Sequence, residues 1–340
     1  MKNKVLIIAE AGVNHNGDMA FAKKLIDVAS DAGVDIVKFQ SFKTEALVSN
    51  KAEKAEYQLQ TTNKEESQFQ MLKKLELSES DHDLLIAYCK QKGLHFLSTP
   101  FDEKSIDVLK NKGINTGKIP SGEITNLPFL LAMSKAFTNI ILSTGMATMD
   151  EIKAAMEVLI QSGTKKNDIT ILHCNTEYPT PMDDVNLKAM LLIQKELGVA
   201  IGYSDHTLGI EVPIAAVALG ATVIEKHFTL DRNMDGPDHR ASLEPDELKA
   251  MVIAIRNIEK AISGSGLKEP SPSELKNKNI ARKSIHLSKD LMKGHSLTSS
   301  DLVMKRPGSG ISPMQIENII GHKLKYDLNA DHMLSLQDLI

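Results

Sequence analysis

An eightfold alternation of strand-like and helix-like segments in the first 263 residues most constrains what this chain can fold into. The strand-like runs are short and apolar, and they lie at 5–12, 36–40, 95–100, 116–122, 139–145, 169–174, 200–206 and 222–228. Between them, apolar residues follow helical spacing and glycines such as Gly163 mark helix ends. Such alternation favours parallel strands joined by crossover helices, and eight units predict a (β/α)8 TIM barrel, an α/β fold.

A change of composition marks the end of this barrel. The last predicted helix ends near Ser263, and the following segment SGSGLKEPSPSELKNKN is rich in Gly, Ser, Pro and Lys without apolar periodicity. We therefore expect a catalytic barrel at 1–263, a linker at 264–280 and a small domain at 281–340. A domain this small has little core of its own and gains stability by docking on something larger.

Composition excludes several classes of protein. The 340 residues carry a formal net charge of -4 and are 42% hydrophobic, so the chain can form a core and is no dedicated nucleic-acid binder. Glu10 interrupts the N-terminal apolar run before it reaches signal-peptide length, and no stretch reaches the roughly 18 apolar residues of a membrane span. We expect a cytoplasmic protein without membrane contact. Cys89 and Cys174 are expected to be buried free thiols.

Two lysines, Lys38 and Lys118, follow apolar strand runs and are expected at the barrel mouth, where functional side chains gather. Two ammonium groups there suit a phosphate or a carboxylate. Hydrogen-bond donors at other strand ends would complete such an anion site: Ser121, Ser204 and Asn175. A Schiff-base lysine is the competing role, and spacing alone does not decide between the two.

His206 and His227 end consecutive strands, 21 residues apart, so their imidazoles should project into the same mouth. Completed by Glu123 or water, this pair would suit Mn²⁺ or Mg²⁺ better than structural zinc. A plain hydrogen-bonding pair is the alternative. The long loop after the eighth strand carries Asp235, Asp238 and His239, and such loops shape substrate pockets. In the small domain, KRPGSGISP presents Arg306 as either a surface charge or a finger reaching a neighbouring site.

These residues lie in motifs that resemble, across essentially the whole chain, those of the N-acetylneuraminate (sialic acid) synthases. The matching motifs occur in order: IIAEAGVNHNG, VKFQSFK, FLSTPFD, KIPSGE, ILSTGMAT, ILHCNTEYPTP, IGYSDHT, IEKHFTLDRNMDGPDH and KRPGSGISP. The resemblance implies a barrel followed by a C-terminal antifreeze-like (SAF) domain. It also implies condensation of phosphoenolpyruvate with open-chain N-acetylmannosamine, with release of phosphate by carbon–oxygen cleavage.

The resemblance assigns roles motif by motif. Phosphoenolpyruvate would be held by Lys38, Lys118, Ser121, Ser204, Thr99 and either Asn175 or Thr176, because this chain reads HCNT where the family often reads HCTN. The sugar would contact Glu10, Gln40, Phe101, Tyr178 and Asp238. The metal ligands would be His206 and His227, usually on Mn²⁺, with Mg²⁺ or Co²⁺ as substitutes. The catalytic groups would be Lys38, Lys118, Glu10 and Glu123, with Glu123 handling protons.

Arg306 would reach the sugar in the other subunit of a domain-swapped homodimer. HCNTEYPTP and GPDH favour N-acetylneuraminate as the product. A legionaminic or pseudaminic acid synthase, acting on a diacetamido-dideoxy hexose, is the closest alternative. A lysine-based aldolase and a sugar- or phosphate-binding barrel without turnover are more distant ones.

Overall fold

The protein forms two compact units in the computed structural model, Met1–Gly264 and Ser265–Ile340. The structure describes all residues except 1–3, 50–51 and 63–64. Each unit has its own apolar core.

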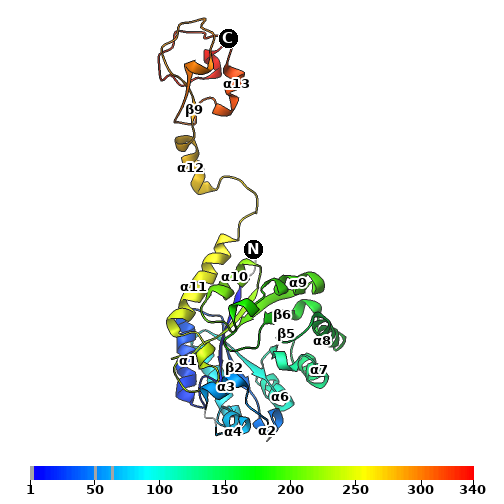
Figure 1. The fold of residues 1–340 in the computed structure, drawn as a ribbon. Helices are drawn as coiled ribbons and strands as arrows, with labels where there is room; N and C mark the ends of the chain where they lie inside the picture. Colours follow the sequence, from blue (N-terminus) through cyan, green and yellow to red (C-terminus); the bar gives the residue numbers. More distant parts are fainter. Residues whose placement is uncertain (1–3, 50–51, 63–64) are drawn as a thin grey trace. The chain divides into compact units, whose positions relative to one another are not determined.

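Within the described residues, the N-terminal unit contains eight parallel strands, hydrogen-bonded in the order β3-β2-β1-β8-β7-β6-β5-β4. The two end strands of this order, β3 and β4, also lie in contact, so the sheet closes. This confirms the predicted (β/α)8 barrel (Figure 1). The strands are β1 (Leu6–Gly12), β2 (Ile36–Ser41), β3 (His95–Pro100), β4 (Thr116–Ile119), β5 (Asn139–Ser143), β6 (Ile169–Cys174), β7 (Ala200–Asp205) and β8 (Val223–His227).

Helices follow each strand and surround the barrel (Figure 1). They are α1 (Met19–Ala32), α5 (Glu79–Gln91), α6 (Glu103–Asn111), α7 (Leu127–Ala136), α8 (Met149–Gln161), α9 (Lys188–Leu197), α10 (Glu211–Ala218) and α11 (Pro245–Ala261). Their ends follow local chemistry: the carboxylate of Asp18 accepts hydrogen bonds from the first amides of α1, and Gly33 ends this helix in the left-handed conformation.

An insertion between β2 and α5 has no counterpart in the predicted alternation. It contains three short helices, α2 (Thr44–Leu47), α3 (Glu56–Thr61) and α4 (Gln68–Lys73). Ion pairs and hydrogen bonds tie it together: Lys73 Nζ lies 2.8 Å from Glu45 Oε1, and Glu76 Oε1 accepts from Thr44 N at 2.7 Å. These contacts join α2 to α4 and to the segment that follows it.

The barrel interior is layered, because successive side chains of a strand point to opposite faces. One apolar layer consists of Ile8, Ile36, Leu97, Ile141, Leu172 and Val223. Two residues further along the same strands lie Glu10, Lys38, Thr99, Ser143, Cys174 and Glu225. The alternation of side chains along the strands therefore places a polar, charged layer next to the apolar layer, nearer the C-terminal ends of the strands.

The C-terminal unit is small and mostly irregular. Its antiparallel strands β9 (Ser284–Leu287) and β10 (Leu302–Lys305) pair over a core that includes Ile285, Leu297 and Leu324. The segment expected as a linker, 264–280, is partly helical: α12 (Pro272–Ala281) follows Ser271, whose hydroxyl and Glu274 form a capping box. A short helix, α13 (Ile316–Ile319), completes the unit. Among the described residues, none of the helices is both long and apolar enough to span a membrane.

Candidate active site

A cavity of about 390 Å³ opens at the C-terminal ends of the barrel strands. The charged layer forms its floor, strand-end histidines form one side, and side chains of the α2–α4 insertion form another. Thirteen of the predicted site residues line this cavity: Glu10, Lys38, Gln40, Thr99, Phe101, Lys118, Ser121, Thr176, Tyr178, Ser204, His206, His227 and Asp238.

The floor is a buried network of two lysines and two glutamates. Lys38 Nζ lies 2.6 Å from Glu10 Oε2 and 3.5 Å from Glu225 Oε2. Lys118 Nζ lies 3.5 Å from Glu225 Oε1, so Glu225 bridges the two ammonium groups. Each of these side chains is at most 5% exposed, so the charges interact through protein rather than through water.

This burial separates the acidities of the two carboxyl groups. Burial raises the pKa of Glu10 to about 7, although the ammonium of Lys38 opposes it. Burial would also raise the pKa of Glu225, but the ammonium groups of Lys118 and Lys38 outweigh it and lower this pKa to about 2. Glu225 is therefore a fixed negative charge, whereas Glu10 can gain or lose a proton near neutral pH.

Hydroxyl groups surround the lysines. Lys38 Nζ donates to Thr99 Oγ1 and Lys118 Nζ donates to Ser143 Oγ, both at 2.8 Å. Ser204 Oγ donates to Glu225 Oε1 at 2.9 Å. Ammonium groups and hydroxyls placed together in this way can bind a multiply charged anion once it enters the cavity.

A close approach of backbone shapes the side of the cavity beside Lys118. Gly145 N donates to Ser121 Oγ at 2.9 Å. A Cβ on Gly145 would lie 2.5 Å from Thr176 Cγ2 and 2.9 Å from Ser121 Oγ, so only glycine fits. Cys174 Sγ lies 3.2 Å from Ser121 Oγ, so this buried cysteine also lines the cavity.

The two strand-end histidines form an aromatic group with Tyr178. The ring centroids of His206 and His227 are 5.4 Å apart, and the Tyr178 ring lies 4.1 Å from that of His206. Burial lowers the pKa of His206 to about 4 and that of His227 well below its ordinary value, so both rings are neutral at physiological pH.

The histidine pair fits the requirements of a catalytic metal site. The backbone carbonyl of Asn175 accepts from His206 Nδ1, so His206 Nε2 keeps a free lone pair. His227 Nδ1 is buried without a hydrogen-bond partner among the described residues. Across the same residues, no three His, Cys, Asp or Glu side chains gather as a metal-binding group. The chain thus offers two nitrogen ligands, and oxygen atoms of substrate or water would complete an open site.

Asp238 and Gln40 lie above the floor, beside Gly12. A Cβ on Gly12, whose φ is +52°, would lie 3.3 Å from Asp238 Oδ2, Gln40 Nε2 and Glu10 Oε1. The backbone at Asp238 is held in place: Asn14 Nδ2 donates to Ser242 Oγ at 2.9 Å, and Ser242 Oγ donates to the Asp238 carbonyl at 2.6 Å. Asn14 therefore positions this loop instead of facing the cavity.

Three residues to which the sequence assigned a catalytic or binding role are not among those that line the cavity. Strand β4 ends at Ile119, and after Pro120 the residues Ser121–Glu123 form a 3₁₀ turn. Because the chain turns here, the carboxylate of Glu123 lies outside the cavity lining and accepts a hydrogen bond from Asn126 Nδ2 at 2.6 Å. Asn175 Oδ1 accepts from Glu177 N at 2.7 Å, which leaves Thr176 as the cavity residue of this motif. Arg306 belongs to the C-terminal unit, where its Nε donates to the carbonyl of Ala281 at 3.1 Å.

Sequence reasoning assigned no role to several residues that line the cavity. Glu225 stands two positions before His227 on the same strand, and this alternation was the signal that could have identified it. Ser143 has the same position on β5. Gln58, Gln68 and Met71 come from the insertion, where the sequence shows no periodic pattern.

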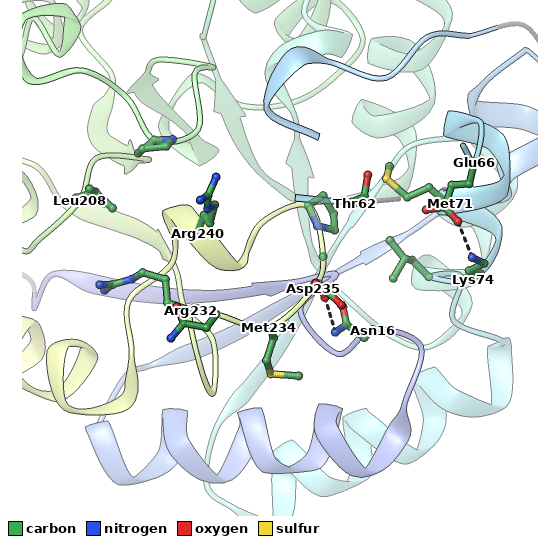
Figure 2. A pocket seen from close by; sticks show the side chains of 15 residues that line it. Asn16, Thr62, Glu66, Met71, Lys74, Leu208, Arg232, Met234, Asp235 and Arg240 are labelled. Carbon is green, nitrogen blue, oxygen red and sulfur yellow. Dashed lines mark hydrogen bonds and ion pairs between the residues drawn. The ribbon is translucent and has the colours of Figure 1, made fainter. Parts of the chain in front are cut away.

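A larger hollow of about 1080 Å³ lies beside the cavity and shares Met71 and Pro237 with its lining (Figure 2). Figure 2 shows Lys74 paired with Glu66 on one side and Asn16 bonded to the Asp235 carbonyl on another. Of the predicted loop residues, Asp238 thus lines the inner cavity and Asp235 the outer hollow. His239 is buried, with Nδ1 2.7 Å from Thr229 Oγ1.

Comparison with known proteins gives consistent matches over both units. The NeuB family model matches residues 25–268, and the SAF domain model matches residues 282–340. An N,N'-diacetyllegionaminic acid synthase of Campylobacter jejuni is 54% identical, over 97% of this chain and 99% of its own. Another, of Legionella pneumophila, is 48% identical over 95% of this chain and 91% of its own. The crystal structure of an N-acetylneuraminic acid synthetase from Leptospira borgpetersenii is 36% identical, covers 81% of this chain and 90% of its own, and has a TM-score of 0.70.

These comparisons overturn the expectation that the product is N-acetylneuraminate. The two synthases that are 54% and 48% identical are named for N,N'-diacetyllegionaminic acid, whereas the N-acetylneuraminic acid synthetase is 36% identical. The main expectation from the sequence is therefore wrong. The findings favour its alternative, a legionaminic acid synthase.

Proposed function

This chain belongs to the NeuB family of nonulosonic acid synthases, with that family's C-terminal SAF domain, and from this premise we propose that it makes N,N'-diacetyllegionaminic acid. The substrates are phosphoenolpyruvate, a diacetamido sugar in its open-chain aldehyde form, and water, and the second product is phosphate. The observation that carries the chemistry is the buried layer of Lys38, Lys118, Glu10 and Glu225 beside two neutral histidines. The choice of sugar rests on the two legionaminic acid synthases.

Phosphoenolpyruvate binds over the two lysines in this proposal. Lys38 and Lys118 supply the positive charge for its phosphate and carboxylate, and Ser204, Thr99 and Ser143 supply hydroxyl groups. Ser121 and Thr176 flank the same region across Gly145. Because the charged groups are already in place before binding, they stabilise the departing phosphate without reorganisation.

His206 and His227 are the metal ligands that we propose, and the family's enzymes are metal-dependent. A divalent ion such as Mn²⁺ would supply Lewis-acid polarisation of the sugar aldehyde. Tyr178 packs against His206 and restricts its orientation. Gln40 and Asp238 lie on the sugar side of the cavity, and Phe101 contributes an apolar surface there.

The reaction requires one carbon–carbon bond to form and one carbon–oxygen bond to break. The methylene carbon of phosphoenolpyruvate attacks the aldehyde carbon, water adds to the phosphate-bearing carbon, and that carbon loses its bond to the phosphate oxygen. The added water gives up both of its protons: one goes to the aldehyde oxygen, and the other leaves with phosphate when the tetrahedral carbon becomes the ketone. Glu10 is the floor carboxyl group with a pKa of about 7, so we assign proton transfer to it rather than to Glu123.

We further propose a homodimer in which Arg306 of one subunit contacts the sugar in the other subunit's cavity. The support is chemical: the cavity lining contains no arginine among the described residues, and Arg306 is an exposed guanidinium in a Gly-rich turn. An Arg306→Ala variant should raise the KM for the sugar and leave the KM for phosphoenolpyruvate unchanged. Equal effects on both constants would contradict this role.

Phosphate release tests the proposed reaction. The purified chain should release phosphate only when phosphoenolpyruvate and the diacetamido sugar are both present, and a chelator should stop the reaction. With ¹⁸O in the bridging position of phosphoenolpyruvate, the label should leave with phosphate. Label retained in the sugar product would refute carbon–oxygen cleavage, and a product trapped by borohydride on a lysine would favour an aldolase instead.

A further inference from the structure

The α4 side of the cavity differs in chemistry from its floor. Met71 and Leu72 of α4 line the cavity, and Met71 packs in a buried apolar cluster with Val13, Phe42 and Leu75. This wall carries no charge that touches the floor network. A substrate group that reaches this wall therefore contacts apolar side chains.

One amide interrupts this apolar wall. Gln68 is the first residue of α4, lines the cavity and is partly buried. Other glutamines of the cavity have partners: Gln40 Nε2 approaches Glu10 Oε1 at 3.5 Å, and Gln58 Oε1 accepts from Ala55 N at 3.0 Å. The side chain of Gln68 has no hydrogen-bond or ion-pair partner among the described residues.

The helix that carries Gln68 is held rigidly. Ser67 caps α4: Ser67 N donates to Gln70 Oε1 at 2.9 Å, and Gln70 N donates to Ser67 Oγ at 3.2 Å. Lys74, which follows the helix, forms an ion pair with Glu66. The backbone that carries Gln68 is therefore held in place, so its side chain starts from a defined point at the cavity edge and no loop has to be ordered when it binds a ligand.

The two candidate sugars differ in what they place against such a wall. Both have an acetamido group next to the aldehyde carbon. The diacetamido sugar has its second acetamido group further along the chain, where N-acetylmannosamine has a hydroxyl. With the aldehyde over the floor, that second group extends toward the rim. It consists of a methyl group, which suits an apolar wall, and an amide, which needs one hydrogen-bonding partner there.

We propose that Gln68 binds the second acetamido group of the sugar and thereby determines specificity for the diacetamido substrate. Its carboxamide pairs with the acetamido N–H or C=O, and Met71 contacts the acetamido methyl group. A hydroxyl in that position would leave much of the apolar wall without a partner. This inference rests on the proposed function, because it takes a diacetamido sugar as the substrate.

The test is the selectivity ratio, kcat/KM for the diacetamido sugar divided by kcat/KM for N-acetylmannosamine, in the full-length chain. Loss of one amide hydrogen bond should lower this ratio about tenfold in Gln68→Leu, and Gln68→Ala should behave alike. The KM for phosphoenolpyruvate should not change. Gln91→Leu is the matched control, because Gln91 is an exposed glutamine outside the cavity lining, and its ratio should stay within about twofold of the wild type.

Each outcome has a distinct meaning. A ratio that is unchanged in Gln68→Leu, or that falls equally in Gln91→Leu, overturns the role of Gln68 and leaves the proposed function intact. A wild-type enzyme that prefers N-acetylmannosamine overturns the proposed function itself, and the role of Gln68 with it.

Discussion

Replacing Glu225 by glutamine removes the negative charge that bridges the two floor lysines while keeping the size of the side chain. Lys38 and Lys118 each lie 3.5 Å from this carboxylate. The lowering of the Glu225 pKa from 4.5 to about 2 corresponds to about 3 kcal/mol in favour of the charged form. Breaking a buried ion pair from one side costs a similar amount, about 3–5 kcal/mol.

Glu225→Gln should therefore lower the free energy of unfolding by about 3 kcal/mol, which corresponds to a Tm lower by roughly 6–12 °C for a domain of this size. Circular dichroism at neutral pH measures this shift. An anion that binds over the lysines should replace part of the missing charge. Saturating phosphate should hence raise the Tm of the variant more than that of the wild type.

The control for this measurement is Glu123→Gln. The Glu123 carboxylate accepts from Asn126 Nδ2 outside the cavity lining, so its loss should cost less than about 1 kcal/mol and should leave the response to phosphate unchanged. If Glu225→Gln were as stable as the wild type, or if phosphate stabilised both variants equally, Glu225 would not be the counter-charge of the anion site.

Three further predictions concern other parts of the structure. Gly145→Ala places a Cβ 2.5 Å from Thr176 Cγ2, so the KM for phosphoenolpyruvate should rise at least about tenfold; an unchanged KM would show that this turn is not part of the anion site. His206→Ala should weaken Mn²⁺ binding more than about tenfold, as measured by calorimetry, whereas a change at the exposed His95, His95→Ala, should leave it unchanged. If the two variants bound Mn²⁺ with equal affinity, His206 would not be a metal ligand. Asp301 accepts from Lys289 Nζ at 2.8 Å and His295 Nε2 at 2.9 Å, and these bonds hold its pKa well below its ordinary value. The stability that Asp301 contributes is present in full above about pH 5 and is lost as the pH falls through its lowered folded-state pKa. Asp301→Asn should therefore expose β9 and β10 to hydrogen exchange at pH 7, and its effect should be smaller at pH 3.

The sequence predicted the barrel because its strands show a strong pattern. Inward positions such as Ile8 are followed two residues later by a polar group such as Glu10, and every strand except β2 is followed by an α-helix of eight residues or more. The position of Lys38 and Lys118 in one floor follows from this alternation. The α2–α4 insertion could not be predicted in the same way, since its helices have only four to six residues and depend on tertiary contacts.

Errors in the site arose where local geometry overrides strand periodicity. Pro120 follows the end of β4, so Glu123 turns toward Asn126, although extrapolation of the strand placed it beside the histidines. Glu225 ends β8 together with His227, but its role depends on Lys38 and Lys118 of other strands, so the sequence alone assigned it none. The motifs that favoured N-acetylneuraminate, HCNTEYPTP and GPDH, supply Tyr178 and Asp238 near the reacting end of the cavity. In our proposal the two sugars differ at the other end, where the insertion lies.

The most direct test of the account is the wild-type enzyme assayed with phosphoenolpyruvate and Mn²⁺ against the two sugars separately. Phosphate release and the mass of the nine-carbon product are followed together. The account predicts a kcat/KM for the diacetamido sugar at least about tenfold higher than for N-acetylmannosamine, with a product that carries two acetamido groups. Equal or greater efficiency with N-acetylmannosamine would contradict it.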